Sequence, residues 1–133
     1  MTDILQNASI GFSRAGEDFW DRSLDLNRLL VSHPVATFFM RVSGDAMKNA
    51  GITAGDILVV DRALAPAHND VVAAVVEGEF LVRRLWHRNK QARLVAEEPG
   101  AVPLGIDPDA GVTIWGVVTC VLHFFRHPGH SDQ

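Results

Sequence analysis

The chain has 133 residues, of which 47% are hydrophobic and 21% charged, a length and composition that suit one globular domain with its own core. Its formal net charge of −4 argues against a protein that binds nucleic acid unaided, because a phosphate backbone demands a basic surface. A single cysteine excludes a disulfide within the chain, and no apolar run reaches the roughly 18 residues of a membrane helix, so we expect a cytoplasmic protein without membrane contact.

The first 25 residues mix glycine, serine, aspartate and isolated aromatic residues without a sustained period. This pattern predicts a mobile N-terminal arm over residues 1–25. Phe12, Phe19 and Trp20 are too apolar for an idle tail, so we expect the arm to dock onto the body of the domain or onto a partner.

A short helix is expected directly after the arm. Leucines at positions 26, 29 and 30 have the i, i+3, i+4 spacing of a helix that packs a leucine edge against the domain. Asp25 is placed to cap its first turn, and His33-Pro34 ends it, because the residue before a proline avoids the helical region.

From residue 36 onward the pattern is that of a β protein. Short apolar runs between turn residues predict strands at 36–42, 56–61, 71–76, 80–85, 91–96 and 113–125. A short helix is expected at 44–50, a long loop at 97–110, and a disordered tail at 127–133. The sequence thus predicts a mostly β domain over residues 26–126.

Two segments of this domain carry the candidate chemistry, Ser43-Gly44-Asp45-Ala46-Met47 and Phe80-Leu81-Val82-Arg83-Arg84-Leu85. They resemble the S24 peptidase family of LexA-like and UmuD-like proteins, and the UmuD-like members more closely. In that family a Ser-Gly-x-Ser-Met segment holds a nucleophilic serine, and a Val-Lys-[Lys/Arg]-Leu strand holds a lysine that acts as general base. By this resemblance Ser43, Gly44, Asp45, Met47 and Val82 form the scaffold of the site.

Both catalytic positions depart from the family. Ala46 stands at the nucleophile position and Arg83 at the base position, and their separation of 83 − 46 = 37 residues matches the family without a gap. Alanine has no oxygen with which to attack, and an arginine side chain stays protonated at any working pH. The resemblance places the self-cleavage site in the arm at Ile10-Gly11, where the family has a small residue before the glycine, so we interpret it as a vestigial site.

The resemblance implies a LexA- or signal-peptidase-like fold, which is a curved, partly closed β-sheet with one or two short helices and an extended N-terminal arm. It also implies a homodimer that takes part in the SOS response to DNA damage, with the RecA filament and a Y-family translesion polymerase subunit as partners. We expect the dimer contact at the C-terminal end of the strand at 113–125, because Val121 to Phe125 would expose a large apolar surface.

Two other hypotheses remain open from the sequence. One is an active self-cleaving peptidase seen in a Ser→Ala form, and the other is a β-rich module that binds single-stranded DNA. Arg83 and Arg84, together with Trp86, His87, Arg88 and Lys90, would supply the basic and aromatic patch for the second. We favour the plain interpretation, a strand with Arg84 outside followed by a polar turn, and therefore expect no direct contact with nucleic acid.

The remaining candidate groups are interpreted as structural. His123, His127 and His130 gather near the C-terminus without carboxylate or thiolate partners at ligand spacing, so we expect a solvated tail and neither metal nor cofactor. Cys120 is expected to be a buried small hydrophobic residue. Arg83 must keep its charge hydrated or paired, and we expect its guanidinium to reach out of the former cleft towards water or towards a carboxylate such as Asp45 or Glu79.

Overall fold

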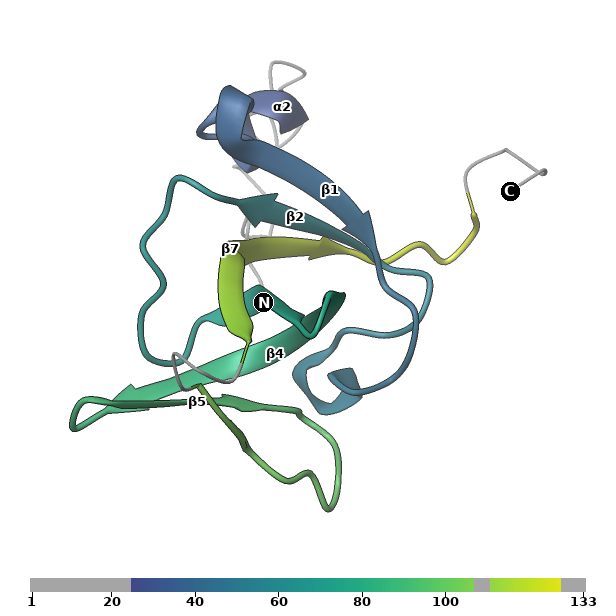
Figure 1. Cartoon of the computed structure of the whole chain (residues 1–133). Helices are drawn as coiled ribbons and strands as arrows, with labels where there is room; N and C mark the ends of the chain where they lie inside the picture. The colour runs from purple at the N-terminus through teal and green to yellow at the C-terminus, as the bar shows by residue number, and fades with distance from the viewer. Residues whose placement is uncertain (1–24, 107–110, 128–133) are drawn as a thin grey trace, which may run out of the picture.

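The structure, a computed structural model, describes residues 25–106 and 111–127 (Figure 1). The predicted arm with its Ile10-Gly11 site, residues 107–110 and the end of the predicted tail from residue 128 lie outside the described residues. No helix within the described ranges has the length and hydropathy needed to cross a membrane.

One antiparallel sheet forms the body of the described chain. Its seven strands are β1 (Thr37–Arg41), β2 (Ile57–Asp61), β3 (Val71–Val76), β4 (Glu79–Arg88), β5 (Gln91–Val95), β6 (Leu104–Gly105) and β7 (Val112–Leu122). Their order across the sheet is β1-β2-β7-β3-β4-β5-β6, so the last strand of the chain lies in the middle (Figure 1). The predicted mostly β, curved sheet is confirmed.

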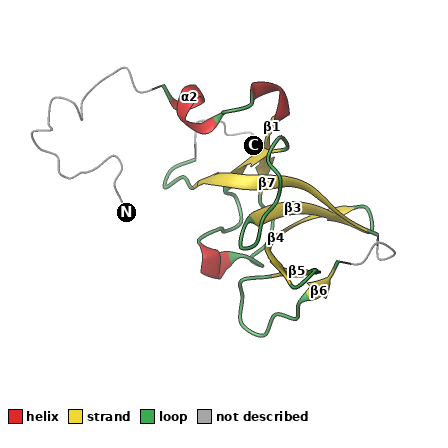
Figure 2. Cartoon of the chain, turned by 90° about the vertical axis from the view of Figure 1, so that its left-hand side faces the viewer, coloured by secondary structure: helices red, strands yellow, loops and turns green. Residues whose placement is uncertain are grey.

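Among residues 25–106 and 111–127, helical structure is confined to short pieces at the periphery of the sheet (Figure 2). Helix α2 (Leu26–Leu30) begins where predicted, and the Asp25 carboxylate accepts a hydrogen bond of 3.0 Å from the backbone N–H of Asn27. The expected leucine edge is wrong, because Leu26 and Leu29 are about 60% exposed and α2 buries none of its residues. A 3₁₀ turn at Pro34–Ala36 follows, and the helix predicted at 44–50 is only a 3₁₀ turn at Lys48–Ala50.

The core consists of two clusters of buried residues, to which β3 contributes from both its faces. Ala73 belongs to a cluster with Met47, Ile52, Leu58 and Val60, whereas Val72 and Ala74 belong to a cluster with Leu85 and Leu94. Successive side chains of a strand point to opposite faces of the sheet, so β3 is covered on both sides. This double burial explains why the sequence of β3 is a continuous apolar run.

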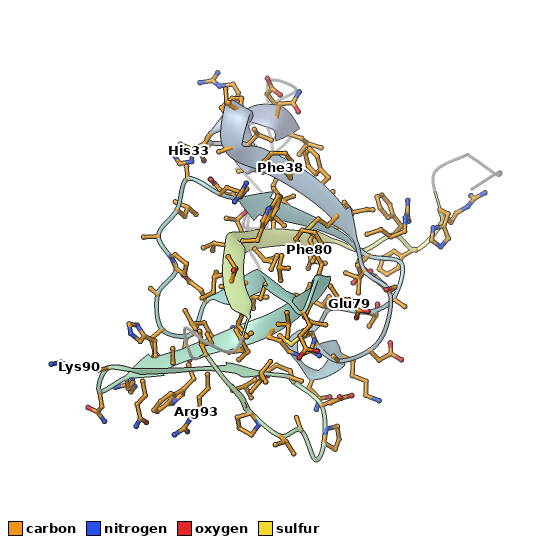
Figure 3. The ribbon with its side chains drawn as sticks, viewed as in Figure 1. His33, Phe38, Glu79, Phe80, Lys90 and Arg93 are labelled. Carbon is orange, nitrogen blue, oxygen red and sulfur yellow. The ribbon has the colours of Figure 1, made fainter. Side chains whose placement is uncertain are left out.

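An aromatic cluster lies over the first of these two clusters. The ring of Trp115 contacts Phe38 of β1 at 5.1 Å and Phe80 of β4 at 5.3 Å between ring centroids, both edge to face (Figure 3). The guanidinium of Arg62 covers the Trp115 ring at 4.3 Å, and its Nε donates to the Trp115 carbonyl. Because Phe38 and Phe80 lie on strands that do not pair with each other, Trp115 connects the two halves of the sheet.

Candidate functional site

A cavity of about 210 Å³ lies where the loop at residues 43–47 meets residues 80–83 of β4. Ala46 and Arg83 both line it, as do the predicted scaffold residues Ser43, Gly44, Asp45, Met47 and Val82. Core side chains such as Ile52 and Leu58 contribute the apolar part of its wall. The two segments singled out in the sequence therefore meet at one site.

Hydrogen bonds at both ends hold the loop beside β4. Val42 follows the end of β1 and exchanges backbone hydrogen bonds of 2.8 Å with Asp56 and Gly55. At the other end, the carbonyl of Ala46 accepts from the N–H of Glu97 at 2.8 Å. Gly44 has φ 121°, a conformation that L side chains rarely adopt, so this turn depends on a glycine.

Arg83 lies on a part of β4 that has a neighbouring strand on one side only. It is opposite Val72 of β3, while β5 pairs with β4 only from Arg84 onward. Its side chain is half-buried, and Nη1 donates a hydrogen bond of 2.8 Å to the carbonyl of Val82. None of the three ion pairs among the described residues includes Arg83, so the carboxylate alternative with Asp45 or Glu79 is not found, whereas the half-buried side chain is consistent with the alternative of hydration.

The cavity holds no pair of side chains with the chemistry of a nucleophile and its base at these two positions. Ala46 offers only a methyl group, and the guanidinium of Arg83 cannot accept a proton. Ser43 also lines the cavity, but its hydroxyl makes no hydrogen bond to a base within the part of the chain that the structure describes. The cavity therefore combines apolar walls with a half-buried guanidinium.

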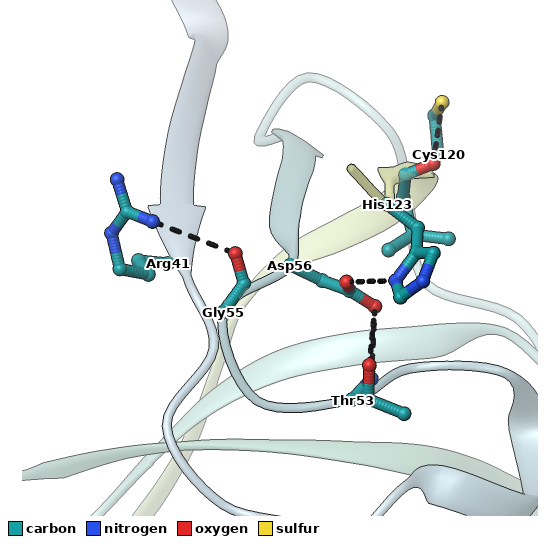
Figure 4. A network of polar contacts seen from close by, with 7 residues as sticks. Arg41, Thr53, Gly55, Asp56, Cys120 and His123 are labelled. Atoms are coloured by element: carbon teal, nitrogen blue, oxygen red, sulfur yellow. Dashed lines mark hydrogen bonds and ion pairs between the residues drawn. The ribbon is translucent and has the colours of Figure 1, made fainter. Parts of the chain in front are cut away.

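A second polar network lies at the start of β2 (Figure 4). His123 Nδ1 donates a hydrogen bond of 2.6 Å to the buried carboxylate of Asp56, whose other oxygen accepts from the backbone N–H of Thr53 at 2.9 Å. Burial raises the pKa of Asp56, but the hydrogen bonds from Thr53 and His123 outweigh it and hold the pKa below its ordinary value. His123 is thus exposed, as expected, but it also has a carboxylate partner in Asp56, which was not expected.

A matching pair lies at the far end of the same strand. His33 Nδ1 donates a hydrogen bond of 2.6 Å to the carboxylate of Asp61, which is also buried. This hydrogen bond is the main cause that holds the pKa of Asp61 below its ordinary value, and burial acts in the opposite direction. Sequence reasoning missed both pairs, although an aspartate at each end of an apolar strand was a visible signal.

Several side chains of the basic patch on β4 and β5 make contacts within the protein. Arg93 lies over the Trp86 ring at 4.6 Å from its centroid, and Arg84 forms an ion pair of 3.5 Å with Glu97. Lys90 lies at the tip of this hairpin, away from the body of the domain (Figure 3). The Trp86 face that a nucleic-acid base would need is therefore shared with Arg93.

Neither metal ligation nor a reactive thiol is found among the described groups. No set of three or more histidine, cysteine, aspartate or glutamate side chains converges within residues 25–106 and 111–127. Cys120 is half-buried rather than fully buried as expected, and burial raises the pKa of its thiol, which keeps it protonated and unreactive.

Comparison with known proteins shows the family to which the chain belongs. Residues 3–119 match the model of the family described as Peptidase S24-like. The protein ImpA of Escherichia coli is 41% identical over 87% of this chain and 79% of its own length, and the protein MucA of Escherichia coli is 41% identical over 93% and 84%. The protein SamA of Salmonella typhimurium is 40% identical over 92% and 85%. This chain is therefore a member of the peptidase S24-like family.

Proposed function

We propose that this protein is a UmuD-like accessory protein of SOS mutagenesis that acts by binding other proteins and does not cleave itself. The observation that carries the proposal is that Ala46 and Arg83, the two positions where the family has its serine and lysine, line one cavity. Membership of the S24-like family and the similarity to ImpA, MucA and SamA support the link to mutagenesis.

The chemistry of the two substitutions supports the absence of cleavage. A serine–lysine mechanism needs a hydroxyl that attacks the peptide carbonyl and a neutral amine that takes its proton. Ala46 removes the first group and Arg83 replaces the second with a permanent cation. Residues that act as such a unit lose nearly all activity when one of them is lost.

The proposed partners follow from the family rather than from this cavity. The chain would form a homodimer in the cytoplasm and bind the RecA filament and a Y-family translesion polymerase subunit. None of these contacts needs a catalytic serine or lysine. The well-formed sheet and the intact loop at 43–47 are consistent with a protein that is retained for binding.

Self-cleavage of three variants tests the proposal. We expect the natural chain and the Ala46→Ser variant to stay intact at alkaline pH and with an activated RecA filament, because Arg83 cannot accept a proton. The double variant Ala46→Ser, Arg83→Lys is expected to cut slowly between Ile10 and Gly11, limited by the β-branched Ile10. Intact-mass spectrometry detects the fragment that begins at Gly11.

Two results would contradict the proposal. A fragment that begins at Gly11 from the natural chain would show another nucleophile at work. Cleavage of the Ala46→Ser variant alone would show that Arg83 is compatible with proton transfer and would favour the hypothesis of a peptidase in a Ser→Ala form. The variant Arg83→Lys alone, which restores only the base, serves as the control and should remain uncut.

A further inference from the structure

The cavity beside Ala46 has a charge opposite to that of the whole protein. Arg41 and Arg83 line it together with one carboxylate, Asp45, so its formal charge is 2 − 1 = +1, whereas the chain carries a net charge of −4. Arg41 and Asp45 are exposed to solvent whereas Arg83 is half-buried, so water screens the charge of Arg83 least. The site therefore favours a ligand group with one negative charge.

The loop on one side of the cavity offers a run of backbone donors. Within the described residues, none of the five N–H groups at positions 43–47 donates to a backbone or side-chain acceptor, whereas the next one, that of Lys48, donates to the carbonyl of Asp45. Successive backbone N–H groups in a turn form concave sites for anions. The loop thus has donors available for a bound oxyanion.

The guanidinium of Arg83, on the other side of the cavity, also has N–H donors that make no recorded hydrogen bond. Arginine has five N–H donors in a planar fork, and the structure records one hydrogen bond from the Arg83 side chain, to the Val82 carbonyl. Arg83 is half-buried and forms no ion pair with any of the described carboxylates. A carboxylate that enters the cavity would complete the coordination of this charge with two parallel hydrogen bonds.

We propose that this cavity binds the side-chain carboxylate of a glutamate in an extended segment of a partner protein, with Arg83 as its ion-pair partner and the loop amides as further donors. The single negative charge of a carboxylate matches the +1 wall, while a phosphate with nearly two charges would be left uncompensated beside Asp45. Met40, Ile52 and Leu58 give the wall apolar surface for the methylene groups of the side chain.

This inference deepens the proposed function, because it says what a site that no longer cuts can still do. In a serine–lysine peptidase the lysine must be neutral to act as base, so the same place cannot hold a permanent cation. The change to arginine exchanges proton transfer for strong recognition of an acidic group. Ala46, which has only a methyl group, leaves the loop amides beside it unobstructed by a hydroxyl.

A titration with a matched pair of small probes tests the proposal. The probes are N-acetyl-glutamate methylamide and its glutamine counterpart, which have nearly the same shape and differ in charge. In ¹⁵N-resolved NMR spectra of the full chain at pH 7 and constant ionic strength, we expect the glutamate probe to shift the amide signals of residues 43–47 and Arg83. The glutamine probe should bind about tenfold more weakly, since charge-assisted hydrogen bonds are the stronger ones. Equal binding of both probes, or shifts confined to other residues, would overturn the proposal.

Variants then identify the charges responsible. Arg83→Gln should weaken binding of the glutamate probe about tenfold, and Arg83→Lys should weaken it less, because lysine keeps the charge but not the fork. Asp45→Asn should strengthen binding severalfold, because it removes a like charge from the wall. Arg84→Gln is the matched control, since Arg84 is the next residue of β4, carries the same charge and does not line the cavity. Unchanged binding by Arg83→Gln, or weaker binding by Asp45→Asn, would refute the assignment.

Two further measurements make the result decisive. Inorganic phosphate is titrated in parallel, and tighter binding of phosphate than of the glutamate probe would overturn the choice of a carboxylate. Mass spectra of the same samples report whether the chain has been cut at Gly11. A cut chain would refute the proposed function alone, whereas the titration decides the glutamate site whether or not cleavage is seen.

Discussion

At the scale of single residues, Asp56 and Asp61 are the buried charged side chains of the described chain, and each is held by a histidine from a neighbouring segment. His123 follows β7 and His33 follows α2, so the two pairs fix both ends of β2 to later and earlier parts of the chain. A buried carboxylate without its hydrogen bonds would be costly, which makes these pairs part of the fold rather than of a solvated surface.

The pairs predict a loss of stability in acid. The pKa of Asp56 is lower in the folded protein than its ordinary value of about 3.9, so the folded state binds fewer protons than the unfolded state in this range. The stabilisation from Asp56 is therefore fully present above pH 3.9 and disappears as the pH falls through the folded pKa. We expect Asp56→Asn to unfold at lower urea concentration at pH 7, and its difference from the unaltered chain to shrink as the pH falls below about 3.9.

The variant His123→Ala separates the contribution of His123 to the low pKa of Asp56 from that of Thr53. Because Thr53 still donates to Asp56 in this variant, we expect a smaller loss of stability at pH 7 than for Asp56→Asn. Urea denaturation followed by tryptophan fluorescence measures the free energy of unfolding at each pH. A difference between Asp56→Asn and the natural chain that stays constant down to pH 3 would contradict the assigned role of the Asp56 charge.

At the scale of the elements, β6 (Leu104–Gly105) lies where the sequence predicts a loop, and β7 pairs irregularly with both of its neighbours. Trp115 has no partner in the pairing of β7 with β3, and Thr119 has none in its pairing with β2. The register of β7 is therefore irregular on both of its sides. A bulge adds one residue and reverses which side chains face each side of the sheet. This is how Ile114 and Val118, which strict alternation would place on one face, join different core clusters.

The bounds of strands could be predicted where a local pattern sets them and not where a contact between distant residues does. The strands around 57–61, 71–76 and 91–95 could be predicted because short apolar runs between turn residues are a local signal. The predicted strand at 113–125 is too long, because it ends at Leu122 where His123 pairs with Asp56. That contact joins residues 67 positions apart, and no local pattern records it.

The close approach of β7 and β2 gives a prediction about Gly116. A Cβ built at Gly116 would lie 2.6 Å from Cγ1 of Val60, so the Val60 side chain or the backbone must shift to make room for it. We expect Gly116→Ala to lower the free energy of unfolding by about 1–3 kcal/mol, as overpacking of a core does. Gly105→Ala is the matched control on strand β6, since a Cβ there meets nothing within 4 Å. Equal melting temperatures for the two variants would contradict the tight contact between β7 and β2.

At the scale of the whole molecule, the apolar surface beyond β7 is the feature with a testable consequence. Phe125 is 96% exposed and Phe124 36% exposed, and they follow a strand that ends at Leu122. The expected dimer contact at this segment remains a prediction. Large exposed aromatic side chains of this kind mark surfaces that bind other proteins.

We expect the protein to form a symmetric dimer through this segment. Light scattering at micromolar concentration should then give about twice the 14.5 kDa mass of the chain. Phe124→Asp should shift the mass toward the monomer, because it would bury a charge at the contact. Val102→Asp is the control: it changes another exposed apolar residue, in a loop outside this segment, and should leave the mass unchanged. A natural chain of monomer mass, or a dimer that Phe124→Asp does not weaken, would contradict the contact.

The sequence predicted that Ala46 and Arg83 lie at one site, but it did not predict the hydrogen-bond partner of the Arg83 guanidinium. The spacing of Ala46 and Arg83 matches a family in which both positions face one cleft, and the structure brings them to one cavity. The sequence does not indicate that Arg83 bonds to its own neighbour Val82 instead of a carboxylate. Such a choice depends on the burial and direction of a long side chain, which only the assembled sheet determines.

The central position of β7 has a consequence for how this protein is made on the ribosome. The pair β1–β2 and the group β3 to β6 can form as soon as they are synthesised, because each consists of strands that are neighbours in the sequence. They cannot join until β7 is made, since β7 pairs with β2 on one side and β3 on the other. A nascent chain that stops at Gly111 therefore carries two half-sheets with unpaired edges, and such edges bind chaperones or aggregate. Completion of the fold is delayed until β7 (Val112–Leu122) has left the ribosome.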